Sequence, residues 1–597
     1  MAKRSKIKKA PADSIFSSES FSGKGNLWIA LLLAVVSFLV YWPSLQSDFV
    51  YDARQEILDE GFVISPENLS NVLSLKTVEM DVMLRDRPGQ ILYMMLINAM
   101  GGKKPFGYHL GSNLLQAANA AILFILLCRL IASELANSDA RAIWRTQLAA
   151  AAATLIFAVH PVAVESVAEV SYCATLLVTF FTLSALLMAT AFRPENFRVA
   201  ILTGGIGVLC AFAAVICKES GAAVASLLAV YWFLFRRQEP KKPWLIFLGG
   251  AIAVTAAFLA ALFFLSPPNR DHLGFLGGSC SQVFLIQPRL WVFMMGKLLW
   301  PMQLSAHYTL PSLEGLSSSF AWLVLLVVIA LQVWLAIKSR VGALGVAIYW
   351  LGLATVSNFV PLYHPVADRF YHLPLAGVAM QLLAVVAMTL KQRLGFWMAM
   401  APVLAVILPL GYLTQVRENV FASDTLLWSD TLRVNPFSSM ARNNLGLTLM
   451  RKGELDGAAS EFRQALKMAP KYLDARNNLG LVLVQKGQAE EGMTQYRQAL
   501  EIDPAFVQAR NNLGLALYQA GRVDEATLNF EKILETHPGI AEVHNNLGLA
   551  LVQKGKKEEA LAEFQKAMAL KPGYSEAQDN AIRTKEELDQ RAAPGAR

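Results

Sequence analysis

The sequence is poor in charge. Asp, Glu, Lys and Arg make up 16% of its 597 residues, whereas soluble globular proteins carry about 25%. The deficit lies before residue 417, where apolar runs long enough to cross a bilayer alternate with short charged connectors. This composition excludes a wholly soluble protein and predicts a multi-spanning membrane domain that lies in the lipid bilayer.

Cysteine is scarce as well. The chain has five cysteines, and none follows Cys280. Their spacing matches no zinc site, and the region after residue 417 has no cysteine with which to build a disulfide framework. The sequence therefore indicates neither a zinc site nor a disulfide-stabilised domain.

Basic residues are spread over particular connectors and form no single face, so a net charge of +8 does not indicate nucleic acid as a partner. Placing these connectors in the cytoplasm satisfies the positive-inside rule and predicts about eleven spans. Because the number of spans is odd, the two ends of the membrane domain lie on opposite sides of the membrane. The amino terminus is then in the cytoplasm, and everything after about residue 417 is outside it. The first apolar run, 26–45, is too long for a signal-peptide core and lacks a small-residue cleavage site, so we interpret it as a retained anchor.

One apolar segment, 279–301, departs from this regular pattern because Pro288 and Gly296 interrupt it. We expect it to lie at the outer surface or to re-enter the membrane. If it spans together with a partner segment, the number of spans changes by two and the orientation is unchanged.

The sequence predicts an all-α chain with five parts. Their boundaries are a basic cytoplasmic tail at 1–25, a membrane domain at 26–417 with its first extracytoplasmic loop at 46–106, a linker with a half-repeat at 418–438, four repeats at 439–576, and a capping helix and tail at 577–597.

The region after residue 439 repeats itself with a period of 34 residues. Each unit has a Leu-Gly pair, a glycine at its central turn, an aromatic residue between alanines, and a closing proline. This period and pattern resemble tetratricopeptide repeats, which stack into an α-solenoid and bind partners on the inner wall. The glycines of the Leu-Gly pairs are Gly446, Gly480, Gly514 and Gly548, and the closing prolines are Pro470, Pro504, Pro538 and Pro572.

A pair of asparagines recurs on the first helix of every unit, at 443–444, 477–478, 511–512 and 545–546. An asparagine amide can bond both the N–H and the C=O of an extended peptide, so this ladder is a candidate acceptor-peptide site. The alternative is that one asparagine of each pair ties its repeat to the next. The candidate peptide-binding residues are Asn444, Asn478, Asn512 and Asn546.

Four polar islands fall at the predicted outer ends of spans, where charges are costly to desolvate and need a reason. The predicted topology places all four on one face of the membrane. They are "SLQSDFVYDARQEIL" at 44–58, "HPVAVESVAEVSY" at 160–172, "CKES" at 217–220 and "YHPVADRFYHLP" at 363–374.

The order of these motifs is similar to that of the transmembrane and tetratricopeptide repeat-containing O-mannosyltransferases and their bacterial relatives. The resemblance rests on "FVYD", "RPGQILYMMLINAMGGKKPFGYHLGSNLL", "HPVAVESVA", "KES" and "VADRFYHLP", followed by the repeat array, and it covers residues 26–576. It implies a GT-C-fold glycosyltransferase that uses a polyprenyl-phosphate sugar donor.

The resemblance also implies roles for particular residues. The family has two adjacent acids after the first span, whereas here Asp52 is followed by Ala53. Asp52 is the expected catalytic base. The other implied residues are Glu165 as a second catalytic acid, Arg369, Lys218 and Arg87 for the donor phosphate, and Asp48, Glu219 and His160 in support.

These residue types suit the transfer of a sugar from a lipid phosphate. An attacking hydroxyl must give its proton to a carboxylate, and cations can offset the charge of the leaving phosphate. One base without a carboxylate nucleophile predicts direct displacement with inversion. No cofactor is required, and a divalent metal is possible although nothing in the sequence indicates one.

The favoured hypothesis is therefore a glycosyltransferase that moves a hexose such as mannose to Ser/Thr hydroxyls of extracytoplasmic proteins bound by the repeats. The compact loops favour a bacterial inner membrane with a periplasmic array. The alternatives are a membrane-anchored scaffold without catalysis and an O-antigen-ligase-like enzyme that transfers an oligosaccharide.

Overall fold

A computed structural model describes most of the chain, and the described residues are helical with no strand. The predicted all-α class is therefore confirmed. The basic tail before residue 24, Lys391, Pro572 and the start of the fourth polar island (363–365) lie outside the described residues. The described ranges are 24–59, 61–80, 84–134, 140–265, 280–309, 317–357, 366–390, 392–571 and 573–592.

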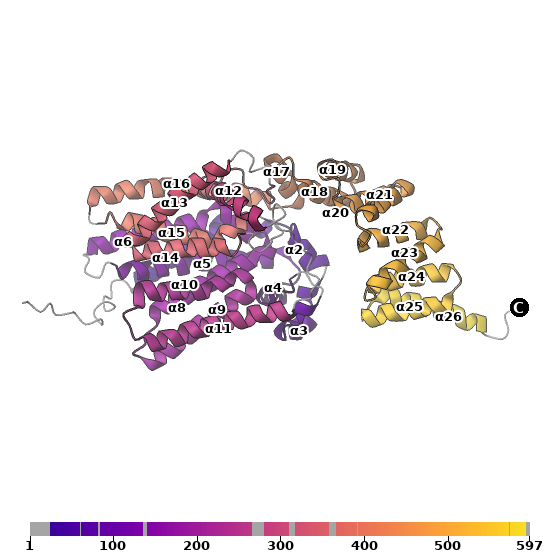
Figure 1. Cartoon of the computed structure of the whole chain (residues 1–597), viewed down its shortest axis with the longest axis horizontal. Coiled ribbons are helices and arrows are strands. Elements are labelled where there is room, and N and C mark those ends of the chain that lie inside the picture. Colours follow the sequence, from indigo (N-terminus) through magenta and orange to yellow (C-terminus); the bar gives the residue numbers. More distant parts are fainter. Residues whose placement is uncertain are drawn as a thin grey trace, which may run out of the picture. The chain divides into compact units, whose positions relative to one another are not determined.

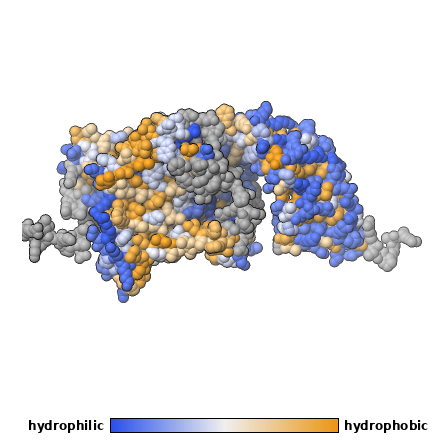
Figure 2. Space-filling view, viewed as in Figure 1, coloured by the Kyte–Doolittle hydropathy of each residue, from blue (hydrophilic) through white to orange (hydrophobic). Residues whose placement is uncertain are grey.

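The chain divides into two compact units, Met1–Asp430 and Thr431–Arg597. The helices of both can be followed in Figure 1. Figure 2 shows that hydrophobic residues cover much of the visible face of the first unit, and hydrophilic residues much of the second. A surface of apolar side chains on long helices is typical of a unit whose solvent is lipid.

Long helices make up the body of the first unit. They are α1 (Lys24–Val40), α5 (Pro105–Ala132), α6 (Ala140–Val159), α8 (Cys173–Ala191), α9 (Phe197–Cys217), α10 (Ala223–Tyr231) with its π-helical continuation η10 (Trp232–Arg236), α11 (Lys241–Leu265), α12 (Cys280–Leu299), α13 (Ser318–Lys338), α14 (Arg340–Ala354), α15 (His372–Ala387) and α16 (Arg393–Val420).

Short helical segments join the long helices. They are η2 (Trp42–Gln46), α2 (Asp52–Arg54), η3 (Gln55–Asp59), η4 (Phe62–Ile64), η5 (Pro66–Asn68), α3 (Leu69–Leu73), η6 (Lys76–Glu79), α4 (Pro88–Gly101), η7 (Pro161–Ala163), α7 (Val164–Ala168), η8 (Val170–Tyr172), η9 (Glu219–Ala222), η13 (Asp368–Tyr371) and α17 (Asp424–Val434).

Within the described ranges, eight helices are long and apolar enough to cross a membrane, and Gly25–Val40 and Arg340–Ala354 are shorter apolar helices. These eight long and two shorter helices leave one of the roughly eleven predicted spans. That span corresponds to α10, whose nine residues continue into η10. The interrupted segment near Pro288 forms one helix, α12, which is not among the eight. The total of about eleven spans and the re-entry of this segment stay predictions.

Small residues let neighbouring helices of the first unit approach closely. A Cβ on Gly345 of α14 would lie 2.7 Å from the carbonyl oxygen of Gly377 on α15, and one on Gly377 would lie 2.6 Å from that of Gly345. Such close backbone approach is how helices associate where lipid, rather than water, surrounds them. This packing fixes the position of α15, which directly follows the segment that carries Arg369.

The second unit consists of helical hairpins and a final helix. Its members are α18 (Ser439–Arg451), α19 (Leu455–Met468), α20 (Leu473–Gln485), α21 (Ala489–Ile502), α22 (Val507–Gln519), α23 (Val523–Thr536), α24 (Ala541–Gln553), α25 (Lys557–Leu570) and α26 (Ser575–Ala592).

The glycine and the aromatic residue of each repeat explain the close packing within a hairpin. A Cβ on Gly480 would lie 2.6 Å from the ring of Tyr496, and the same relation holds for Gly446 and Phe462 at 2.7 Å. Helix α19 buries Ala458, Ala459, Phe462 and Ala465, the spacing of a single helical face. The predicted tetratricopeptide solenoid is therefore present in the structure.

We predict that Gly480→Ala loosens the second hairpin, because the added methyl group must displace the Tyr496 ring. Overpacking of this kind costs about 1–3 kcal/mol. Hydrogen exchange of the purified full chain should become faster across residues 473–502. The matched control is Gly539→Ala, where an added Cβ meets nothing within 4 Å, and unchanged exchange in both variants would contradict this account of the packing.

Candidate active site

Asp52 opens a short helix whose backbone is held in an unusual conformation. The preceding residue, Tyr51, has a φ of 52°, a region that costs a bulky residue about 1–3 kcal/mol. Its backbone N–H donates to an Asp424 oxygen at 2.8 Å, and its ring meets that of Trp428 with centroids 4.9 Å apart. These contacts hold the strained turn and thereby fix the direction of Asp52.

The Asp52 carboxylate accepts a hydrogen bond of 2.9 Å from the Tyr172 hydroxyl. Burial raises the pKa of Asp52 above its usual range, and the Tyr172 hydrogen bond and the positive charge of Arg369 partly offset that rise. A carboxylate with a raised pKa is a stronger base than an ordinary aspartate. The residue is only partly buried, so a substrate group can approach it.

Arg369 and Glu165 form a buried ion pair, with side chains 8% and 2% exposed. A guanidinium nitrogen of Arg369 binds one oxygen of Glu165, and the backbone N–H of Arg369 donates to the other at 2.8 Å. The guanidinium also stacks on the Tyr172 ring, 3.9 Å from its centroid. Tyr172 thus joins Arg369 to Asp52 through its ring and its hydroxyl.

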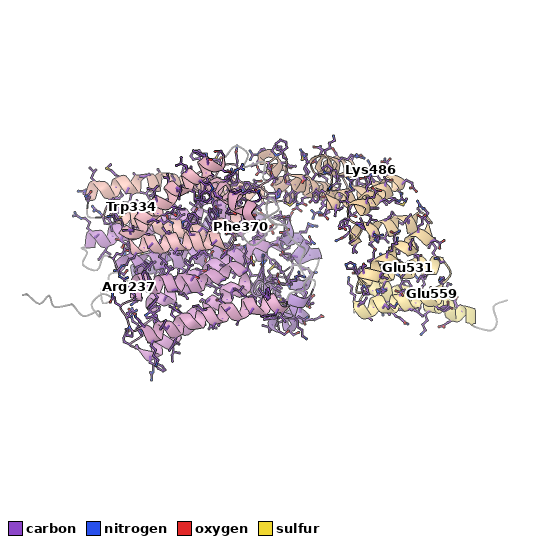
Figure 3. The ribbon with its side chains drawn as sticks, in the orientation of Figure 1. Arg237, Trp334, Phe370, Lys486, Glu531 and Glu559 are labelled. Carbon is purple, nitrogen blue, oxygen red and sulfur yellow. The ribbon has the colours of Figure 1, made fainter. Side chains whose placement is uncertain are left out.

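Lys218 lies beside the same cluster. Its ammonium nitrogen is 5.6 Å from the centroid of the Phe370 ring, and the Arg369 guanidinium is 5.3 Å from that centroid. Figure 3 labels Phe370 far from Arg237, which lies at the opposite end of the helices of this unit. Burial, with the nearby charge of Arg87, lowers the pKa of Lys218 to about 7.

Arg87 directly precedes α4 and forms an ion pair with Glu219, with nitrogen and oxygen 3.9 Å apart. Both side chains are partly exposed, at 31% and 45%. The pair therefore lies on the exposed side of the cluster, where its energetic contribution is small.

Glu169 is a buried acid that the sequence reasoning did not single out. One of its oxygens accepts from the backbone N–H of Ala53 at 3.1 Å and from that of Ser171 at 3.3 Å. Burial and the negative charges of Asp52 and Glu56 raise its pKa well above the usual range. A carboxylate from another segment thus holds the backbone of Ala53, the position where the resemblance implies a second acid. The signal in the sequence was an acid within the apolar part of the second island.

Two of the predicted supporting residues have other partners. His160 follows the last residue of α6; its Nδ1 accepts from the Val162 N–H at 3.2 Å, and its Nε2 lies 2.8 Å from the carbonyl oxygen of Leu298. Burial lowers its pKa to about 4, so its ring is neutral at physiological pH. Asp48 is exposed, and its backbone N–H donates to Ala422 at 3.3 Å.

A second group of buried charges adjoins Arg369. The Tyr308 hydroxyl donates to Asp368 at 2.8 Å. Arg417 lies 3.8 Å from the other Asp368 oxygen and 3.0 Å from an oxygen of Asp430. Because Asp368 directly precedes Arg369, this group anchors the start of η13 to the end of α16. Sequence reasoning missed it, since its members are far apart along the chain.

Among the residues that the structure describes, no group of three or more His, Cys, Asp or Glu side chains is placed to hold a metal ion.

In the repeat unit the asparagines form a ladder between successive first helices. The amide nitrogen of Asn478 donates to the side-chain oxygen of Asn443 at 3.0 Å, and that of Asn512 donates to Asn477 at 2.9 Å. Asn546 to Asn511 and Asn580 to Asn545 repeat the contact at 3.0 and 2.9 Å. Tying one repeat to the next is therefore a role of these pairs. Asn444 takes no part in these rungs; it accepts from Asn443 at 3.3 Å.

Comparison with known proteins assigns the chain its relatives. It is 25% identical over 525 residues to protein O-mannosyl-transferase Tmtc3 of Drosophila melanogaster, covering 75% of this chain and 56% of that protein. It is 23% identical over 460 residues to protein O-mannosyl-transferase F38B6.6 of Caenorhabditis elegans, covering 74% and 63%. The homologues of this chain are protein O-mannosyl-transferases. The resemblance stated from the motifs is thus confirmed, although the chain spans less than two thirds of the length of these relatives.

The repeat unit also matches family models. The model described as TPR repeat matches residues 446–487 and 480–521, and the one described as Tetratricopeptide repeat matches 511–575. Among solved structures, MamA protein aligns at 21% identity with a TM-score of 0.23, covering 26% of this chain and 85% of MamA. YrrB, described as a TPR protein with an unusual peptide-binding site, aligns at 22% identity and a TM-score of 0.23, covering 32% and 96%.

We predict that Glu165→Gln destabilises the first unit strongly. The substitution leaves the buried Arg369 guanidinium without its counter-charge, and breaking a buried pair in this way costs about 3–5 kcal/mol. The free energy of unfolding should fall by that amount when the purified full chain is titrated with denaturant in mixed micelles. Asp48→Asn at the exposed position is the control and should change it by less than about 0.5 kcal/mol; equal stability of the two variants would contradict the structural role of the pair.

Proposed function

We propose that the first unit transfers a hexose, mannose in the simplest case, from a polyprenyl-phosphate donor to Ser/Thr hydroxyls of extracytoplasmic proteins. The observation that carries the proposal is the convergence of Asp52, Tyr172 and Arg369 with Lys218 close by. A partly exposed carboxylate beside buried cations is the arrangement that a hydroxyl nucleophile and an anionic leaving group require. The names of the relatives support the same reaction.

In the proposed reaction, Asp52 accepts the proton of the acceptor hydroxyl as its oxygen bonds to the anomeric carbon. The bond from that carbon to the phosphate oxygen breaks, and the electron pair leaves with the lipid phosphate. The positive charges of Arg369, Lys218 and Arg87 stabilise the leaving phosphate without protonating it. A single displacement of this kind inverts the configuration at the anomeric carbon.

Glu165 has a different role in this scheme from that of a second catalytic acid. Both of its oxygens are engaged by Arg369, so it is a positioning residue that orients the guanidinium. Glu169 is a positioning residue as well, because the hydrogen bond that it accepts from the Ala53 N–H fixes the backbone that carries Asp52.

The repeats would bind the acceptor polypeptide and raise its concentration at the membrane. The ladder engages the amide nitrogens of Asn478, Asn512 and Asn546. Their side-chain oxygens remain suited to accept from peptide N–H groups, a recognition that does not depend on acceptor side chains. The proposed location is the inner membrane, with the amino terminus in the cytoplasm and the repeats in the periplasm.

Asp52→Asn tests the proposal directly. The amide keeps the size of the side chain and can still accept from Tyr172, but it cannot take up the hydroxyl proton. Loss of a general base lowers the rate by about 10²–10⁴. Mass spectrometry should show loss of the hexose from Ser/Thr peptides of extracytoplasmic proteins in cells that carry the variant.

The matched control is Asp48→Asn, which removes an exposed acid of the same loop and should leave the modification intact. Transfer by Asp52→Asn at the wild-type level would end the assignment. A scaffold without catalysis would behave in that way, because it needs no base at this position.

A further inference from the structure

Helix α17 has the sequence register of the second helix of a tetratricopeptide unit. Trp428 lies eight positions before Pro436, and the same interval separates Phe462 from Pro470 in the first full repeat. Trp428 also precedes Phe462 by one repeat period. Helix α17 therefore corresponds to α19, the second helix of the first full repeat.

The first half of this leading unit does not follow the repeat pattern. In the first full repeat, the Phe462 ring packs against Gly446 on the preceding helix, α18. One period before Gly446 the chain has Tyr412, which lies in the long helix α16. The Tyr412 residue is 68% exposed, whereas Trp428 is 1% exposed. Another part of the chain must therefore cover the Trp428 ring.

The segment 47–52, which carries the proposed base, covers that ring. The Trp428 ring meets the Tyr51 ring with centroids 4.9 Å apart and planes at 85°, the edge-to-face geometry that aromatic pairs favour. The Tyr51 N–H donates to a carboxylate oxygen of Asp424, four positions before Trp428, at 2.8 Å. In the leading unit, this segment thus covers the aromatic residue that a first helix covers in a full repeat.

The same helix is bonded to the cation side of the site. Arg417 donates to Asp430 of α17 at 3.0 Å and lies 3.8 Å from Asp368, the residue before Arg369. Asp430 and Asp368 therefore share one cation, which links α17 to the start of η13. One helix thus contacts the turn before the proposed base directly and, through Arg417, the segment that carries Arg369.

We infer that α17 is a positioning element of the active site, with Asp424 and Trp428 as its positioning residues. The inference rests on the proposed function, because it takes Asp52 as the base. Tyr51 has a φ of 52°, a conformation that persists only where surrounding contacts maintain it. Loss of the α17 contacts lets this turn relax and moves Asp52, the next residue. A displacement of about 1 Å in a reacting group can lower the rate about 10²-fold.

This assignment separates two roles within the carboxyl-terminal part of the chain. The four full repeats would determine how tightly the acceptor binds, which affects KM. Helix α17 would determine how fast the bound acceptor reacts, which affects kcat. A linker without a positioning role would affect neither quantity.

Asp424→Ala tests the contact and its effect on transfer separately. In the purified full chain, hydrogen exchange should become faster across residues 49–57, because the Tyr51 N–H loses its acceptor. With polyprenyl-phosphate mannose as donor and an acceptor protein identified by mass spectrometry, kcat should fall by about 10²-fold and KM for the acceptor should stay unchanged. Asp424→Asn is the matched rescue, since its amide oxygen can accept from the same N–H, and it should keep the wild-type exchange and kcat.

Trp428→Ala has a matched control at the same register of a full repeat. Phe530 lies three periods after Trp428 and is also buried. Trp428→Ala should speed exchange across residues 49–57 and lower kcat, and Trp428→Phe, which keeps an aromatic ring, should restore both. Phe530→Ala should speed exchange across its own hairpin, 507–536, and should leave kcat and the exchange of 49–57 unchanged.

Unchanged exchange across residues 49–57 in either alanine variant of α17 would overturn the inference, as would faster exchange with an unchanged kcat. An equal fall in kcat in Phe530→Ala would also overturn it, because the effect would then be common to any damage in the repeats. Failure of the proposed function has a different signature. Wild-type transfer by Asp52→Asn would reject the base, while the exchange data would still report the packing of the segment 47–52 on α17.

Discussion

The buried pair of Arg369 and Glu165 is the contact on which the candidate active site of the first unit depends. Removing two charges from water costs free energy, and only good pair geometry with further hydrogen bonds offsets that cost. Here the backbone N–H of Arg369 and the face of the Tyr172 ring supply those further contacts. The same ring directs its hydroxyl to Asp52, so the position of the proposed base depends on an ion pair two contacts away.

Unfavourable local features gather around that pair. Tyr51 has a positive φ of 52°, Lys218 is buried close to the cations Arg87 and Arg369, and Glu169 is a buried acid close to two others. Features of this kind persist where the surrounding structure holds them in place and the activity needs them. The close packing of Gly345 against Gly377 is part of the rigid helical body that holds them here.

The sequence predicted the helices, the repeats and the islands because each is encoded locally, by apolar length, by period or by a cluster of charges. The topology rule then brought Asp52, Glu165, Lys218 and Arg369 to one face. It could not assign partners, since the contact of Tyr51 with Asp424 joins residues 373 positions apart. The period likewise identified both asparagines of each pair, but only geometry shows which one donates to its neighbour. For His160 the sequence left two roles open, because a histidine before a proline is equally typical of a substrate contact and of a helix end.

The dependence of kcat/KM on pH tests most directly whether these buried charges form one reactive centre, because it reports groups of the free enzyme. Lys218, with a pKa of about 7, loses its positive charge as the pH rises through that value. The account predicts that kcat/KM for sugar transfer then falls, by about tenfold for each further pH unit, and that Lys218→Arg, which stays charged, removes this fall. A wild-type profile that is level from pH 6 to about pH 9, or the same fall in both proteins, would contradict it.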